Sequence, residues 1–181
     1  YYVIVADMNP EAEGFEFADK KYVVSTIDTD ALIEIVEKEK PDGIVTAATD
    51  MPMRSIAYIG EKFNLNTISY ETSLKATDKF KMRESLKKNN VPIPEYYLVS
   101  NREDYKIALA KIKGKKIVKP VDSSGSRGIF LLEKHDDIEV AFKHAIENSK
   151  TKTILVEEYM EGDEVSVETL SIEGETHVIA I

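Results

Sequence analysis

The chain has no cysteine and only three histidines among its 181 residues. The absence of cysteine excludes disulfides, thiolate metal sites and a cysteine nucleophile. It also means that cysteine usage does not indicate an oxidising or a reducing compartment. The three histidines, His135, His144 and His177, are not spaced like the ligands of a metal ion. We therefore expect each of them to have a surface or hydrogen-bonded structural role.

Positive charge is also scarce, because 24 Lys and Arg stand against 33 Asp and Glu, a formal net charge of −9. Non-specific nucleic-acid binding needs a basic face that displaces counterions, and an anionic membrane surface attracts basic segments. No apolar run approaches the roughly 20 residues of a membrane span. With no signal peptide recognisable at its start, we expect a folded cytoplasmic protein that binds neither nucleic acid nor membranes.

Three common active-site motifs are missing as well. The sequence has no G-x-x-x-x-G-K-[ST] loop, no G-x-G-x-x-G turn and no G-x-S-x-G elbow. The first residue is Tyr1, and the first and last residues both lie in apolar, strand-like runs. We expect a piece of a longer protein, although two complete edge strands would also explain these ends.

The segment from Tyr1 to Tyr70 alternates between strand-like and helix-like patterns. Helical spacing of apolar residues predicts helices near 31–38 and 53–63. Short apolar runs predict strands at 3–6, 22–24, 43–47 and 66–69. Strands that alternate with helices form right-handed crossovers and a parallel sheet. The pattern predicts an α/β fold that opens with a parallel doubly wound unit, and we expect this unit to lack its first strand and helix.

The pattern changes at a boundary near residues 72–95, where Pro92 and Pro94 follow a short polar helix at about 78–88. Beyond it, a capping box from Ser100 to Glu103 opens one helix and Asp136 opens another. The predicted strands of this half are 96–99, 116–119, 128–132 and 153–157, followed by a hairpin of 164–170 and 177–181 around Glu173-Gly174. This half should therefore be α+β with antiparallel pairing.

The strongest chemical signal is a lysine that ends a strand and precedes a loop of small polar residues. The lysine is Lys119, and the loop consists of Ser123, Ser124, Gly125, Ser126, Arg127 and Gly128. Small residues let backbone N–H groups approach phosphate oxygens, and successive N–H groups can form an anion site. Lys119 would add a compact positive charge at its rim. A mobile hairpin turn beside a surface lysine is the alternative.

Two further segments point in the same direction. The stretch that leaves the strand at 153–157 contains Glu157, Glu158 and Tyr159, whose exposed backbone can offer a donor and an acceptor to an adenine edge. In the same stretch Met160 can pack on a purine face, and Glu164 can accept from ribose hydroxyls. Taken alone, this stretch could equally be an acidic loop.

Lys79 opens a predicted helix, where a positive charge gains nothing from the helix dipole. A ligand phosphate would explain this lysine, and a solvated helix end is the alternative.

Taken together and in this order, the three segments resemble the ATP-grasp superfamily. Its pattern is a lysine at a helix start, then a second lysine before a small-residue loop, then an E-x-Y-[ML] hinge, and here these are Lys79, Lys119 and residues 157–160. The likeness is greatest to the branch that holds the large chain of carbamoyl-phosphate synthase, biotin carboxylase, the purine-pathway carboxylases and the bacterial L-amino-acid ligases. It covers essentially the whole chain.

The resemblance implies roles for these residues. Lys79 and Lys119 would contact ATP phosphates, the loop from Ser123 to Gly128 would cover the triphosphate, and Glu157 to Met160 would bind adenine. Glu164 would lie on the ribose. The implied domains are a pre-ATP-grasp domain at 1–75, a linker helix at 76–95, a small lid subdomain at 96–162 and the start of the large subdomain at 163–181.

The resemblance also implies an activity for the parent protein. It would use ATP to turn a small carboxylate or bicarbonate into an acyl phosphate, which an amine then attacks, with release of ADP and phosphate. The Mg²⁺ ligands of the family lie beyond residue 181, so we expect no metal ligand and no catalytic residue in this chain, and no catalysis by the chain alone. Relatives often dimerise, so a homodimer is a further expectation.

Two rival functions fit parts of the sequence. A nucleotide-sensing or regulatory module could share the lid and lack ligase chemistry, and acidic metal ligands further along the parent chain would separate the two. Asp7, at the end of the strand at 3–6, could instead be the ribose acid of a dinucleotide fold. That reading needs a glycine-rich turn before residue 1, and acids at strand ends are also common as caps.

Overall fold

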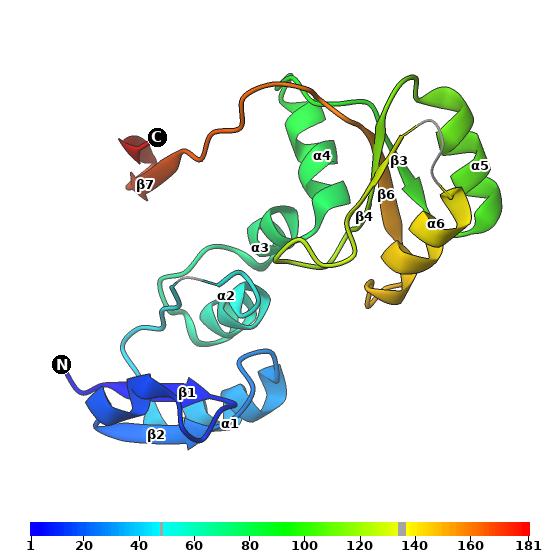
Figure 1. The fold of residues 1–181 in the computed structure, drawn as a ribbon. Coiled ribbons are helices and arrows are strands. Elements are labelled where there is room, and N and C mark those ends of the chain that lie inside the picture. Colours follow the sequence, from blue (N-terminus) through cyan, green and yellow to red (C-terminus); the bar gives the residue numbers. More distant parts are fainter. Residues whose placement is uncertain (48, 134–136) are drawn as a thin grey trace.

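The computed structural model describes residues 1–47, 49–133 and 137–181. The fold is mixed α/β, and the chain runs from a small N-terminal unit through two central helices to a four-stranded sheet (Figure 1). No helix within these ranges is long and apolar enough to cross a membrane. His135 and the helix start predicted at Asp136 lie outside the described residues.

The N-terminal unit packs two helices against a pair of parallel strands. Its elements are β1 (Ile4–Asp7), the 3₁₀ helix η1 (Glu13–Phe17), β2 (Lys20–Val23), α1 (Thr29–Glu39) and α2 (Met53–Phe63). Ile4 lies opposite Lys20 in the parallel register, and the core of the unit centres on Leu32, Val36 and Ile59. The predicted parallel pairing and both predicted helices are confirmed.

Two strands predicted in this unit, 43–47 and 66–69, are wrong. Ile44 packs against the core of the unit as a strand residue would, but its neighbour Val45 is 89% exposed. Within the described residues the sheet of this unit has only the strands β1 and β2, so neither segment has a partner there. A short apolar run predicts burial, whereas a strand also needs a hydrogen-bonded neighbour.

A helix that the sequence did not predict, α3 (Tyr70–Thr77), precedes the predicted helix α4 (Lys79–Lys88). Ser69 caps α3 by accepting a hydrogen bond from the Thr72 N–H at 3.1 Å. Short and mostly polar, α3 carries no clear apolar period. The capping serine was the signal that could have revealed it.

The second half forms one antiparallel sheet in the order β3-β6-β4-β5. Its elements are β3 (Tyr96–Val99), α5 (Arg102–Lys111), β4 (Lys116–Pro120), β5 (Phe130–Leu132), α6 (Ile138–Glu147) and β6 (Ile154–Glu158). Helices α5 and α6 cover one face, and α4 lies on the other side (Figure 1). The predicted antiparallel α+β arrangement is confirmed.

The start of α5 differs in detail from the predicted capping box. Asn101, rather than Ser100, is the cap, and its side chain accepts from the N–H groups of Glu103 and Asp104 at 2.9 Å each. Asp104 accepts from the N–H of Ser100, the residue before the cap, at 3.2 Å. The cap is therefore shifted by one residue, because an asparagine amide oxygen caps as well as a serine hydroxyl, and the reciprocal bond of a capping box is not formed.

Strand alternation decides which side chains reach the face on the α4 side. Ile154 and Val156 of β6, and Val118 of β4, belong to the core beneath α5 and α6. Successive side chains of a strand point to opposite faces. Lys119 and Glu157 therefore point to the opposite face, towards α4.

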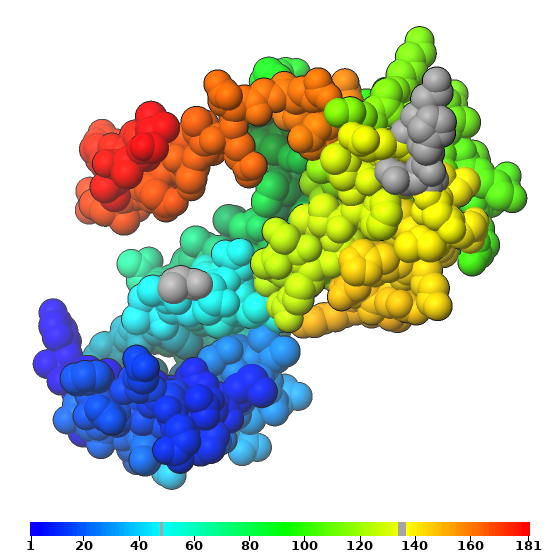
Figure 2. Space-filling model, in the orientation of Figure 1, coloured from blue at the N-terminus to red at the C-terminus, as the bar shows by residue number. Residues whose placement is uncertain are grey.

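The chain continues into a hairpin of β7 (Glu168–Ile172) and β8 (Glu175–Ala180), with Ile172 opposite Glu175. Glu173 and Gly174 have φ of 51° and 87°, as a two-residue turn of this kind requires. The predicted turn is confirmed, while both strands start and end a few residues away from the predicted limits. All residues of the hairpin are exposed, and it stands apart from the other elements (Figures 1 and 2).

Candidate functional site

The first predicted site residue, Lys79, joins the start of α4 to the loop that follows β4. Asp78 caps the helix by accepting from the Lys81 N–H. The Lys79 N–H donates to Val121 O at 2.9 Å, and its Nζ donates to Ser123 O at 2.5 Å. Two segments that are distant in the sequence therefore meet at this lysine.

The ammonium of Lys79 lies in a half-buried place near a second cation, Lys119. Burial lowers its pKa, and the positive charge of Lys119 lowers it further, against the opposing effect of nearby carboxylates. Among the described residues no carboxylate lies within ion-pair distance of Lys79. An anionic ligand would stabilise this charged amine.

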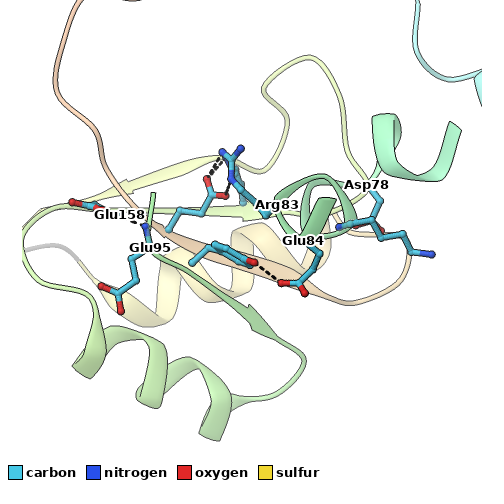
Figure 3. Close-up of polar contacts among 9 residues, drawn as sticks. Asp78, Arg83, Glu84, Glu95 and Glu158 are labelled. Carbon is cyan, nitrogen blue, oxygen red and sulfur yellow. Dashed lines mark hydrogen bonds and ion pairs between the residues drawn. The ribbon is translucent and has the colours of Figure 1, made fainter. Parts of the chain in front are cut away.

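Lys119, the second predicted lysine, belongs to an ion cluster that consists of Arg83, Lys119 and Glu157. Glu157 has a side chain only 3% exposed, and it pairs with Lys119 through Oε2. Arg83 approaches the same carboxylate from α4, with Nε 2.7 Å from Oε1 and Nη2 3.3 Å from Oε2 (Figure 3). One buried carboxylate thus holds two cations from different elements.

Arg83 was not singled out from the sequence. It lies one helical turn after Lys79, so both side chains start from the same face of α4. That spacing was the available signal, but the partner of Arg83 lies on a distant strand and could not be read from it.

The predicted phosphate loop, residues 123–128, is fixed at both ends. Asp122 accepts from the N–H groups of Thr151 at 2.7 Å and Lys150 at 3.3 Å, which ties the loop to the segment before β6. At the other end, Gly128 has φ of 77° and leaves no room for a side chain between Pro120 and Asn148.

Between these ends the loop exposes backbone donors. Gly125 and Ser126 both have positive φ, at 64° and 56°. Within the described part of the chain, the N–H groups of residues 123–126 donate no hydrogen bond, while Lys79 and Arg127 donate to the carbonyls of Ser123 and Ser124. Free N–H groups beside cationic side chains form an arrangement suited to phosphate oxygens.

Replacing Asp122 by asparagine should loosen this loop. Partial burial works to raise the pKa of Asp122, but hydrogen bonds from Thr151, Ser149 and Lys150 outweigh burial and lower it. An amide keeps one acceptor and turns an N–H group towards the other donor, so we expect a loss of about 1–3 kcal/mol in unfolding free energy at neutral pH.

The pH dependence of this loss has a definite sign. Because the folded pKa lies below the ordinary value of 3.8, the contribution of Asp122 is present above pH 3.8 and disappears as the pH falls through the folded pKa. Urea unfolding at neutral and acidic pH measures it. Asp163→Asn, in an exposed segment, is the matched control, and an equal loss in both variants would contradict the anchoring role.

The predicted adenine segment, residues 157–160, is only partly free to bind. The Glu158 N–H donates to Glu95 O at 2.8 Å, and the Tyr159 N–H donates to Lys115 O at 3.1 Å. Figure 3 shows Glu158 beside Glu95, whose N–H donates to the Glu158 carboxylate at 3.2 Å. Met160 is 66% exposed, and among the described residues its N–H has no acceptor.

Glu164 lies in the exposed stretch between β6 and β7. In the described part of the chain, no hydrogen bond or ion pair joins Glu164 to the lysines or to the loop. The structure therefore brings together Lys79, Lys119, Glu157 and the loop, and does not bring Glu164 to them.

A cavity of about 700 Å³ opens between the loop and the N-terminal unit. Lys79 and loop residues 123–127 line one side, and the other side includes side chains that the sequence did not single out: Thr29, Asp50, Arg54 and Ser55. The Arg54 Nε donates to Thr77 Oγ1 at 2.7 Å, which fixes the guanidinium near the start of α4. Lys119, Gly128 and residues 157–160 are not part of this lining.

The remaining candidates have local roles. The Asp7 carboxylate accepts from the Asn9 N–H at 2.7 Å, as a cap at the end of β1 would. The His144 ring meets the edge of Phe130 with centroids 6.5 Å apart, and His177 is exposed on β8. Among the described residues, no three His, Asp or Glu side chains gather closely enough to hold a metal ion.

Comparison with known proteins identifies the second half of the chain with a family. The model of a family described as "ATP-grasp domain" matches residues 76–181. The formate-dependent phosphoribosylglycinamide formyltransferase of Parabacteroides distasonis is 30% identical over 164 residues, which cover 89% of this chain and 42% of that protein. The carbamoyl phosphate synthase large chain of Clostridium acetobutylicum is 28% identical over 186 residues, which cover 99% of this chain and 17% of that protein.

Solved structures agree with this comparison. The phosphoribosylglycinamide synthetase of Anaerococcus prevotii superposes with a TM-score of 0.67 at 27% identity, over 93% of this chain and 42% of that chain. The L-amino acid ligase of Bacillus licheniformis shares the fold, with a TM-score of 0.71 at 23% identity over 89% of this chain and 38% of that chain. The chain spans less than half the length of each of these relatives.

Proposed function

Because the chain belongs to the ATP-grasp family, we propose that it carries the part of an ATP-dependent ligase that binds the nucleotide. In this proposal the complete protein phosphorylates a small carboxylate or bicarbonate with ATP, an amine displaces the phosphate from the acyl phosphate, and ADP and phosphate leave. The chain by itself is proposed to be inactive.

The observation that carries this proposal is the meeting of Lys79, Lys119 and the loop at one place. Lys79 has its amine half-buried with no carboxylate in ion-pair distance in the described residues, and the N–H groups of residues 123–126 are unused there. A half-buried ammonium costs free energy when nothing negative neutralises it. A triphosphate would supply that negative charge.

In the proposed mechanism these groups act through position and charge. Lys79 and Lys119 hold phosphate oxygens, and the loop N–H groups receive the charge that develops on the transferred phosphoryl group. The loop also excludes water from the acyl phosphate, which otherwise hydrolyses. Mg²⁺ would neutralise further phosphate charge, and we propose that its ligands come from residues outside this chain.

The remaining assignments belong to the same proposal. Met160 would pack on the purine and use its free N–H at the adenine edge, beside Glu157, Glu158 and Tyr159, and Glu164 would reach the ribose once the large subdomain is complete. The proposed domains are a pre-ATP-grasp domain at 1–75, a linker at 76–95, a lid at 96–162 and the start of the large subdomain at 163–181. A homodimer is proposed by analogy with the dimeric members of the family.

Replacing either lysine tests the proposal. In the intact protein, Lys119→Ala and Lys79→Ala should each weaken ATP binding by roughly ten- to a hundredfold, because each removes a charge-assisted contact to phosphate. Lys119→Ala should also lower kcat for ADP release with a screened set of carboxylates and bicarbonate. Calorimetric titration with ATP gives the affinity, and Lys143→Ala, at an exposed position on α6, is the matched control.

Two outcomes would redirect the proposal. ATP affinity that equals the control in both variants would remove the lysines from the site. ATP binding without release of ADP for any acceptor would favour the nucleotide-sensing module over the ligase.

A further inference from the structure

The ion cluster is unusual because its single carboxylate is almost fully enclosed. The Glu157 side chain is 3% exposed, against 14% for Lys119 and 20% for Arg83. Removing the cation from a buried carboxylate leaves an uncompensated charge, which strongly destabilises the protein. The Glu157 carboxylate therefore needs a cation whatever else happens at the site.

The two cations hold Glu157 in different ways. Arg83 contacts both oxygens, at 2.7 Å to Oε1 and 3.3 Å to Oε2, and this double contact with a planar guanidinium restricts its movement. Lys119 contacts only Oε2, through a point charge at the end of a flexible four-carbon stem. Lys119 is thus the cation that can leave, and Arg83 is the one that can stay.

A phosphate bound near the loop would compete with Glu157 for Lys119. If Lys119 were the only partner of Glu157, its transfer to a phosphate would leave a buried carboxylate without a cation. The ion pair would then oppose phosphate binding. With Arg83 in place, Glu157 remains paired after Lys119 moves. The free energy for transferring Lys119 to a phosphate is then smaller.

We propose that Arg83 is a positioning residue for nucleotide binding, which keeps Glu157 paired and so lets Lys119 move from Glu157 to a phosphate. This inference rests on the proposed function, since it assigns Lys119 a phosphate to bind. Arg83 itself touches no nucleotide in this scheme and acts through Glu157.

A purely structural tie between α4 and the sheet is the competing account of Arg83. The helix has other ties to β3. Tyr96 donates a hydrogen bond to the Glu84 carboxylate (Figure 3), and the Tyr96 ring meets the Phe80 ring with centroids 6.2 Å apart. Loss of Arg83 should therefore leave α4 docked, which allows a binding measurement on the folded variant.

The test compares ligands with and without phosphates in the intact protein. Arg83→Met should raise the Kd for ATP and ADP at least tenfold and raise the Kd for adenosine far less, because only the phosphate ligands need Lys119. Arg83→Lys keeps the charge with a single contact and should recover part of the affinity. Arg102→Met, which breaks an exposed ion pair with Glu139 on the opposite face, is the matched control.

A double-variant cycle separates action through Glu157 from direct contact. In the Glu157→Gln background Lys119 is no longer held by a carboxylate, so adding Arg83→Met should leave ATP affinity unchanged within about twofold. Thermal unfolding of each variant confirms that it is folded. If Arg83→Met does not fold, Arg83→Lys provides the test, since it should weaken ATP binding several-fold and adenosine binding far less.

The other outcomes overturn the inference. If Arg83→Met weakens the binding of ATP and of adenosine equally, Arg83 has a structural role. If Arg83→Met weakens ATP binding as much in the Glu157→Gln background as in the parent, Arg83 contacts the phosphate directly. ATP affinity unchanged in Arg83→Met, with the parent protein binding ATP, removes the role of Arg83 and leaves the proposed function intact. A parent protein that binds no ATP removes both.

Discussion

Replacing Gly128 by alanine should cost about 2–5 kcal/mol of unfolding free energy and strongly weaken nucleotide binding. An added Cβ would lie 2.6 Å from the Asn148 Cβ and 2.7 Å from the Pro120 Cγ, both far inside normal contact. The φ of 77° adds about 1–2 kcal/mol for a residue with a side chain, and overpacking adds about 1–3 kcal/mol. The loop end can relieve the overlap only by moving away from β4.

Gly125 provides the control for this prediction within the same loop. Its φ of 64° is also positive, but nothing lies within 4 Å of an added Cβ. Gly125→Ala should therefore show only the backbone cost of about 1–2 kcal/mol. Chemical unfolding and ATP titration of both variants separate packing from conformation. Equal losses at Gly125 and Gly128 would contradict the anchoring role of Gly128.

Removal of the Tyr105 side chain should destabilise the four-stranded sheet by about 3–5 kcal/mol. Tyr105 is 2% exposed, its ring lies 5.0 Å from the Phe142 ring between centroids, and its hydroxyl donates to Ile138 O at 2.9 Å. Tyr105→Ala deletes all three contributions. Tyr105→Phe keeps the ring and should cost only about 1 kcal/mol.

Alkaline pH gives a second readout for the same residue. Burial, together with the charge of Asp137, raises the pKa of Tyr105 from 10.0 to about 12. The contribution of the neutral tyrosine is therefore complete below pH 10 and is lost as the pH rises towards 12. Thermal unfolding from pH 8 to pH 11 should show this loss in the parent and a smaller one in Tyr105→Phe, and identical pH profiles would contradict it.

The sequence was predictive where the signal lay in neighbouring residues of the chain. Lys79 and Lys119 are recognisable because a helix start and a strand end are marked by neighbouring residues, and the structure brings their surroundings together. The hairpin turn at Glu173-Gly174 is confirmed for the same reason, since Gly174 adopts its φ of 87° without steric cost.

The features that could not be predicted depend on contacts between residues far apart in the sequence. The pairing of Arg83 with Glu157 joins residues 74 positions apart, and no periodic pattern encodes it. The N–H groups of Glu158 and Tyr159 are used by Glu95 and Lys115, so the predicted exposed backbone is smaller than expected. The strand predicted at 43–47 failed in the same way, because a strand exists only beside another strand.

The hairpin of β7 and β8 has a consequence for how the protein behaves at high concentration. Leu170, Ile172, Val178 and Ile179 are each at least half exposed, and both strands have one edge without a neighbour in the described structure. Such edges offer unpaired N–H and C=O groups to any extended segment, and apolar side chains reinforce the match. We therefore expect concentrated solutions of the 181-residue chain to self-associate through intermolecular β-sheet at this hairpin.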